Sequence, residues 1–169
     1  FFSLDISINE IFCSSYAKSI NYKENFPATK NISFIDMGFN KTSITCYHKN
    51  KIVFLDVLPI GGNHITKDIS KVLEVDLKEA ENLKLCFDKN QSILNEKKIS
   101  LDLIQNIIFA RIEEILELCA NSIKLNLTSS DQFKMILMGE GSKILDNKFK
   151  EKISFSNDID LLEETLEDI

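Results

Sequence analysis

Tryptophan is absent from this chain, and turn-forming residues are scarce, with five Gly and two Pro among 169 residues. Such a composition excludes a collagen-like chain or a low-complexity linker. The apolar runs are also too short to span a bilayer, and no basic segment followed by an apolar one begins the chain. What is present, 44% hydrophobic and 27% charged residues, is typical of one folded globular domain.

The four cysteines lack the paired spacing of a zinc site or a redox motif. They are more than thirty residues apart, at Cys13, Cys46, Cys86 and Cys119. Isolated thiols of this kind are typical of proteins in a reducing compartment. We therefore expect free thiols and a cytosolic protein.

The net charge of −6 comes from one end of the chain. The last thirteen residues carry six acidic side chains and no Lys or Arg, so the rest of the chain is close to neutral. A neutral body with an acidic end offers no basic surface for nucleic acid, and an anionic membrane would repel it. We therefore expect no nucleic-acid partner and no direct membrane contact for this chain.

Hydrophobic periodicity predicts an α/β domain. A helix is expected over residues 7–22. Its inward face would be formed by Ile8, Ile11, Phe12, Ser15 and Ser19. Runs rich in β-branched and aromatic residues then predict strands at residues 32–36, 43–48, 52–58, 135–138 and 153–155.

The pattern changes to helical period after Pro59. Two short helices are expected, with apolar stripes at Ile65, Ile69, Val72 and Leu73 and at Ala80, Leu83 and Phe87. Ser100 is a suitable N-cap for a long helix with Leu101, Ile104, Ile108, Ile112, Ile115 and Cys119 facing inward. A final helix is expected from Ile159, Leu162, Leu166 and Ile169. Together these elements predict a mixed sheet with helices on its faces.

A tight turn between the first two strands is the first candidate site. Its sequence is Asp36-Met37-Gly38-Phe39-Asn40-Lys41-Thr42. Backbone N–H groups of such a turn can converge on phosphate oxygens where a Gly permits close approach, and an Asp can hold Mg²⁺ through water. The alternative is a hairpin turn that only connects two strands.

Two Gly-containing segments that open helices are further candidates. They are Pro59-Ile60-Gly61-Gly62-Asn63-His64 and Met138-Gly139-Glu140-Gly141-Ser142. A helix N-terminus that follows a strand can accept a nucleotide. The alternative in each case is an ordinary strand-to-helix turn, and His64 is then a structural residue.

In their order and spacing, the three segments resemble the second domain of the actin, sugar kinase and heat-shock chaperone ATPase superfamily. Two further features narrow the resemblance to the bacterial cell-division family FtsA. One is the run at residues 58–69 followed by Glu79-Ala80-Glu81-Asn82-Leu83-Lys84, and the other is Ala110-Arg111-Ile112-Glu113-Glu114-Ile115-Leu116. The similarity extends from about Ile6 to Ser142.

The resemblance implies a ribonuclease-H-like core with a mixed five-stranded sheet, flanked by helices as in actin-type ATPases. Residues 1–63 and 121–169 would form this core, subdomain 2A, and residues 64–120 an inserted, mostly helical subdomain 2B. The first residue is Phe rather than Met, which indicates that an N-terminal portion precedes it. The family's first domain and its C-terminal membrane helix are expected to be missing.

The resemblance also implies that ATP and Mg²⁺ are the cofactors. Asp36, Gly38, Asn40 and Thr42 would contact the phosphates, with Asp36 holding Mg²⁺ through water. The adenosine contacts would be Glu81, Lys84, Gly139, Glu140, Gly141 and Ser142. Phe39 and Asn40 stand where the family's loop has glycines, which affects hydrolysis more than binding. Hydrolysis is expected to be slow at most, and this chain alone to be inactive.

The implied function is that of an ATP-binding, actin-like scaffold for septum formation. Such a protein links the FtsZ ring to the cytoplasmic membrane, recruits the divisome and self-associates into filaments. It would be cytoplasmic and peripheral on the inner face of the membrane, bound there only through an anchor that this chain lacks. The alternatives are an actin-like pilus-assembly protein and another ATPase of the sugar kinase and chaperone superfamily.

Arg111 is the candidate contact for the C-terminal peptide of FtsZ. It stands at an expected apolar position, at the edge of the long helix's inward stripe. Either it pairs with Glu114 on the same helix, or it forms a charge-assisted hydrogen bond to an acidic group of the peptide. The resemblance favours the second interpretation.

Overall fold

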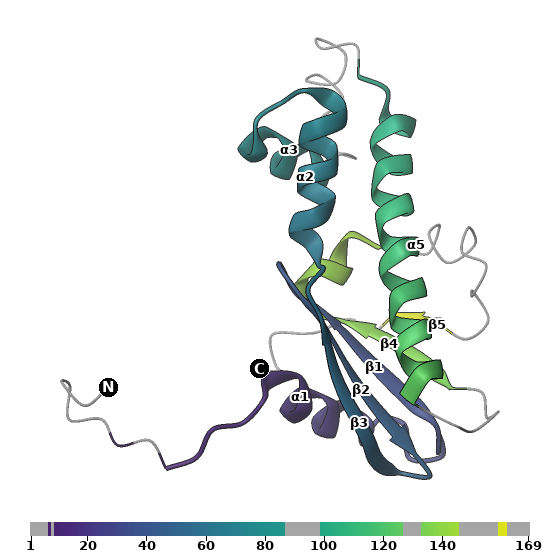
Figure 1. The fold of residues 1–169 in the computed structure, drawn as a ribbon. Helices are drawn as coiled ribbons and strands as arrows, with labels where there is room; N and C mark the ends of the chain where they lie inside the picture. Colours follow the sequence, from purple (N-terminus) through teal and green to yellow (C-terminus); the bar gives the residue numbers. More distant parts are fainter. Residues whose placement is uncertain (1–6, 8, 87–98, 127–132, 146–158, 162–169) are drawn as a thin grey trace.

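A five-stranded mixed sheet lies at the centre of the fold (Figure 1). The computed structural model describes residues 7, 9–86, 99–126, 133–145 and 159–161. The strand order is β3-β2-β1-β4-β5, with antiparallel pairs β1–β2 and β2–β3 and parallel pairs β1–β4 and β4–β5. The strands are β1 (Ile32–Met37), β2 (Thr42–His48), β3 (Lys51–Leu58), β4 (Lys134–Met138) and β5 (Ile159–Leu161).

Helices cover both faces of this sheet. They are α1 (Ser14–Lys23), α2 (Gly62–Leu73), α3 (Leu77–Cys86), α5 (Leu101–Asn126) and the 3₁₀ helix η2 (Glu140–Ile144). The lower half of α5 packs on one face and α1 on the other, while α2 and α3 rise beyond the sheet beside the upper half of α5 (Figure 1).

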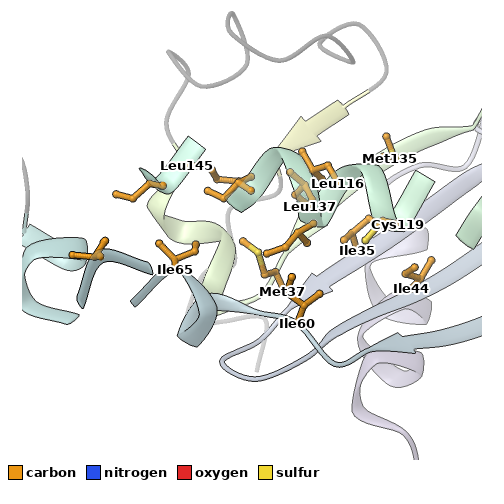
Figure 2. Packing of buried hydrophobic residues seen from close by; sticks show 14 of the residues in the cluster. Ile35, Met37, Ile44, Ile60, Ile65, Leu116, Cys119, Met135, Leu137 and Leu145 are labelled. Atoms are coloured by element: carbon orange, nitrogen blue, oxygen red, sulfur yellow. The ribbon is translucent and has the colours of Figure 1, made fainter. Parts of the chain in front are cut away.

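Alternation along β1 explains why this strand is central. Ile35 and Met37 face α5 and join the larger hydrophobic cluster, while Ile32 and Phe34 face α1 and join a second cluster that includes Tyr22. Figure 2 shows the side chains of Ile35 and Met37 pointing toward α5. All four β1 side chains are almost fully buried, and each such burial contributes about 1.5–3 kcal/mol. The apolar residues of β1 therefore face both sides of the sheet, and the polar Ser33 between Ile32 and Phe34 is buried as well.

The predicted strands at residues 32–36, 43–48, 52–58 and 135–138 are confirmed to within one or two residues. The long helix is also confirmed, since five of its six expected inward residues are buried and Leu101 is half-buried. Cys46 and Cys119 are buried free thiols, and burial raises the pKa of each to about 12.

The prediction for residues 7–22 was wrong at its start, because α1 begins only at Ser14. Ser15 and Ser19 are buried as expected, but the side chains of Ile11 and Phe12 are 86% and 65% exposed. The backbone of Cys13 is extended, which places the N-cap there. Two apolar residues at helical spacing were therefore mistaken for another turn of helix.

Two further helical expectations were wrong. Ile159 belongs to β5, which pairs in parallel with β4, so sheet pairing overrides the helical spacing there. Val72 is 53% exposed although it follows the α2 stripe. The expected strand at residues 153–155, Ile8, Phe87 and the rest of the final helix lie outside the described residues.

The expected boundary between residues 120 and 121 falls inside α5, which runs without interruption from the region beside α2 to the sheet. The two expected subdomains therefore share one helix and one hydrophobic cluster. Among the helices that the structure describes, none is long and apolar enough to cross a membrane.

Candidate functional site

The turn between β1 and β2 is docked onto the start of α2. The carbonyl oxygens of Gly38 and Phe39 accept the backbone N–H groups of Gly62, at 3.0 Å, and Asn63, at 2.7 Å. Gly61 permits this approach, because a Cβ at that position would lie 2.6 Å from the carbonyl oxygen of Gly38. The first two candidate segments therefore form one unit.

Two of the predicted phosphate contacts have partners inside this unit. The hydroxyl of Thr42, which is fully buried, donates to the carbonyl oxygen of Ile60 at 2.7 Å. The side-chain amide of Asn63 donates to Oδ1 of Asn40 at 2.9 Å. Both residues therefore hold the turn against α2 in this structure.

Asp36 lies at the end of β1, on the face that α1 covers. Its side chain is 15% exposed, and Nζ of Lys18 lies 3.7 Å from Oδ1. Gly139, at the end of β4, lies directly against this carboxylate with φ of 92°. A Cβ there would touch Asp36 Oδ1 and lie 2.8 Å from the carbonyl oxygen of Met37. The first and third candidate segments therefore meet at Asp36.

Lys84 is a buried lysine that joins α3 to α2. Its Nζ donates to Glu81 Oε2 at 2.7 Å, to the Thr66 hydroxyl at 2.8 Å and to the Gly62 carbonyl oxygen at 3.2 Å. The hydroxyl of Thr66 donates to the same oxygen of Glu81. An ammonium group has three hydrogens to donate, so these three acceptors satisfy it. Lys84 thereby fixes one oxygen of Glu81 and the first turn of α2.

A cavity of about 540 Å³ opens beside this network, between α3 and η2. It is lined by Phe39, Gly62, Ile65, Glu81, Lys84, Leu85, Glu140, Gly141, Lys143 and Ile144. Two acidic and two basic side chains therefore face one space, and Lys143 pairs with Glu140 as Lys84 pairs with Glu81.

Of the residues predicted to bind adenosine, the cavity brings together Glu81, Lys84, Glu140 and Gly141. Ser142 is buried next to it and donates its hydroxyl to the Gly139 carbonyl oxygen at 2.7 Å. Asp36, Gly38, Asn40, Thr42 and Gly139 do not line the cavity.

Sequence reasoning missed the apolar walls and one charge of the cavity. Ile65, Leu85, Lys143 and Ile144 each line it. Leu85 and Lys143 directly follow predicted site residues, so sequence proximity alone could have suggested them. Ile65 was assigned only to a hydrophobic stripe, and its second role depends on how α2 sits against η2.

Arg111 clamps α5 to α2. Its Nη2 donates to Asp68 Oδ1 at 2.9 Å, its Nε donates to Asp68 Oδ2, and its Nη1 donates to Glu114. The hydrogen bonds to Asp68 raise the pKa of Arg111 above its usual value. The Glu114 pair was one of the two interpretations offered, whereas the Asp68 partner, 43 residues away, was not foreseen. Contact with a peptide stays a prediction.

The family model "Cell division protein FtsA" matches residues 33–146, which is more than half of the chain and includes all three candidate segments. The chain belongs to the FtsA family. FtsA of Rhizobium meliloti is 26% identical over 158 residues, covering 83% of this chain and 36% of that protein. FtsA of Bacillus subtilis is 31% identical over 108 residues, covering 55% and 24%. This FtsA-family chain thus spans about a third of the length of curated relatives it matches.

Solved structures show the same fold at low sequence identity. The ethanolamine utilization protein EutJ of Carboxydothermus hydrogenoformans has a TM-score of 0.63 and 18% identity, with 86% of this chain and 46% of that chain covered. The PilM–PilN type IV pilus biogenesis complex has a TM-score of 0.67 and 16% identity, with 91% of this chain and 42% of that chain covered. MreB5 of Spiroplasma citri bound to AMPPNP has a TM-score of 0.58 and 17% identity, with 87% of this chain and 52% of that chain covered. The expected actin-like ATPase fold is confirmed.

Proposed function

We propose that this chain forms one side of a nucleotide site in an FtsA-type scaffold. The cavity between α3 and η2 carries the proposal, because its volume of about 540 Å³ lies in the range of small-molecule sites. Ile65, Leu85 and Ile144 supply apolar walls suited to a base. Glu81, held by Lys84 through one oxygen, keeps the other as an acceptor suited to sugar hydroxyls. The neighbour bound to AMPPNP supports a nucleotide as the ligand.

Asp36 can supply only part of the coordination of a Mg²⁺ ion. Among the described residues, no group of three metal-ligating side chains occurs. Mg²⁺ is commonly held through one or two carboxylates plus water and substrate phosphates, so a single half-buried carboxylate at a strand end fits such an ion. When bound, Mg²⁺ would neutralise phosphate charge.

His64 lies in the turn that opens α2. The Nδ1 of His64 accepts the N–H of Gly61 at 3.2 Å and so closes the first turn of α2. This contact supports a structural role for His64. We propose, on the family resemblance and on Phe39 and Asn40 in the place of loop glycines, that turnover in the complete protein is slow at most and that the nucleotide acts through conformation.

Equilibrium binding of Mg²⁺-ATP tests the proposal. The superfamily closes two domains on one nucleotide, so we expect this chain alone to bind ATP more weakly than about 10 μM, or roughly 7 kcal/mol. In the complete protein, Asp36→Ala should weaken the binding of Mg²⁺-ATP or filament formation more than His64→Ala does. Tight binding by this chain, or equal effects of the two substitutions, would contradict the assignment.

Membership of the FtsA family supports a role in cell division. We propose that the complete protein links the FtsZ ring to the membrane, recruits the divisome for septum formation and self-associates into filaments. It would lie on the cytoplasmic face of the membrane. The likeness to the PilM–PilN complex concerns the fold, whereas the family match separates this chain from pilus-assembly proteins.

Arg111→Glu is expected to lower affinity for a synthetic FtsZ-tail peptide by at least about tenfold, or roughly 1.4 kcal/mol. The substitution replaces attraction to acidic peptide groups with repulsion. Fluorescence anisotropy with a labelled peptide measures the change.

The clamp requires a control, because Arg111→Glu also places a third carboxylate near Asp68 and Glu114. Asp68→Asn weakens the same clamp but leaves the arginine charge, so peptide affinity should hold or rise. If both variants lose affinity equally, Arg111 acts through the clamp and the peptide contact is wrong.

A further inference from the structure

The carboxylate proposed to hold Mg²⁺ already has a cation beside it. Asp36 follows Ile32 and Phe34 on the face of the sheet that α1 covers. From α1, Lys18 reaches across this face and brings Nζ to 3.7 Å from Asp36 Oδ1. Neither Lys18 nor Asp36 lines the cavity, so this ion pair is separate from the cavity's own charges.

We propose that Lys18 is a resident counter-charge of Asp36, which a divalent cation must displace before it can use this carboxylate. The inference rests on the proposed nucleotide function, since it concerns the same carboxylate. Lys18 would then be a positioning residue that lowers the affinity of Asp36 for the metal ion.

The two side chains differ in a way that permits exchange. Asp36 is 15% exposed, and Gly139 lies against it, so its position is fixed. Lys18 is 38% exposed and carries its charge on a flexible stem that can turn into water. An ammonium group and a divalent cation repel each other at one carboxylate, so the metal ion is favoured where Lys18 has moved away.

The size of the effect follows from the exposure of the pair. Ion pairs with one well-exposed partner are weak, so the competition should change metal affinity by about threefold rather than by orders of magnitude. Salt screens such a pair, and the difference between variants should therefore shrink as ionic strength rises.

The test uses Mn²⁺ alone as a paramagnetic probe of the 169-residue chain, with amide signals of Asp36 and Gly38 followed by NMR. Lys18→Met should lower the Mn²⁺ concentration for half-maximal broadening by about threefold. Lys23→Met is the matched control, because it removes the same charge from α1 but its Nζ donates to the Phe26 carbonyl oxygen. It should change little, and Asp36→Asn should abolish the broadening.

Equal broadening in the wild-type chain and Lys18→Met, or the same gain in Lys23→Met, would overturn the inference, as would an absence of broadening in every variant. Because no nucleotide is added, the outcome is independent of whether the cavity binds one. Failure of the nucleotide proposal is therefore distinguishable from failure of this one.

Discussion

Gly139→Ala is expected to lower the free energy of unfolding by at least about 2 kcal/mol. The backbone φ of 92° is a conformation that L side chains rarely adopt. A Cβ would also touch the Asp36 carboxylate and lie 2.8 Å from a backbone oxygen of Met37. Urea denaturation followed by circular dichroism measures the loss.

Gly62→Ala is the matched control, because it adds the same methyl group at another glycine of the candidate site. A Cβ on Gly62 would meet its nearest neighbours at 3.7 Å, and the residue opens α2. Stability should therefore stay unchanged or rise by up to about 1 kcal/mol. If Gly139→Ala is as stable as Gly62→Ala, the close approach of β4 to Asp36 is wrong.

Lys84→Met is expected to weaken nucleotide binding by at least about tenfold, or roughly 1.4 kcal/mol. The substitution frees the Glu81 carboxylate from its buried cation and leaves the Gly62 carbonyl oxygen without that donor. The cavity then presents unbalanced negative charge to an anionic ligand. Isothermal titration with ADP measures the effect.

Lys143→Met is the control that distinguishes the role of the buried Lys84 network from the effect of the cavity's net charge. It removes one positive charge from the same cavity, but the Lys143 side chain is 53% exposed and pairs with the more exposed Glu140. Solvent screens such a pair, so affinity should fall by less than about threefold. Equal losses in the two variants would show that net charge, rather than the buried network, decides binding.

Local patterns predicted most of the fold. The strands β1 to β4 and the helix α5 have strong periodicity, and their turns carry glycine, asparagine or proline. The wrong predictions concern residues whose structure depends on contacts distant in the sequence. Ile159 pairs with β4 and so belongs to the sheet rather than to a helix. No described residue covers Ile11 and Phe12, so their apolar side chains do not extend α1. Neither outcome is encoded in the local spacing.

The candidate site was predictable in its parts but less so in its geometry. Family resemblance placed Glu81, Lys84, Glu140 and Gly141 in one site, and the cavity brings these four together. Spacing alone could not show that Lys84 is saturated by three acceptors on α2 and α3. It also could not show that Lys18, from an element outside the three segments, reaches Asp36.

The central claim is that the cavity between α3 and η2 takes a nucleotide. Titration of the isotopically labelled chain with ADP, followed through backbone amide shifts, tests it most directly. We expect progressive shifts concentrated at Gly62, Leu85 and Gly141, which line the cavity. In Lys84→Met the same shifts should need at least about tenfold more ADP. An absence of shifts at millimolar ADP, or shifts confined to residues away from the cavity, would contradict the account.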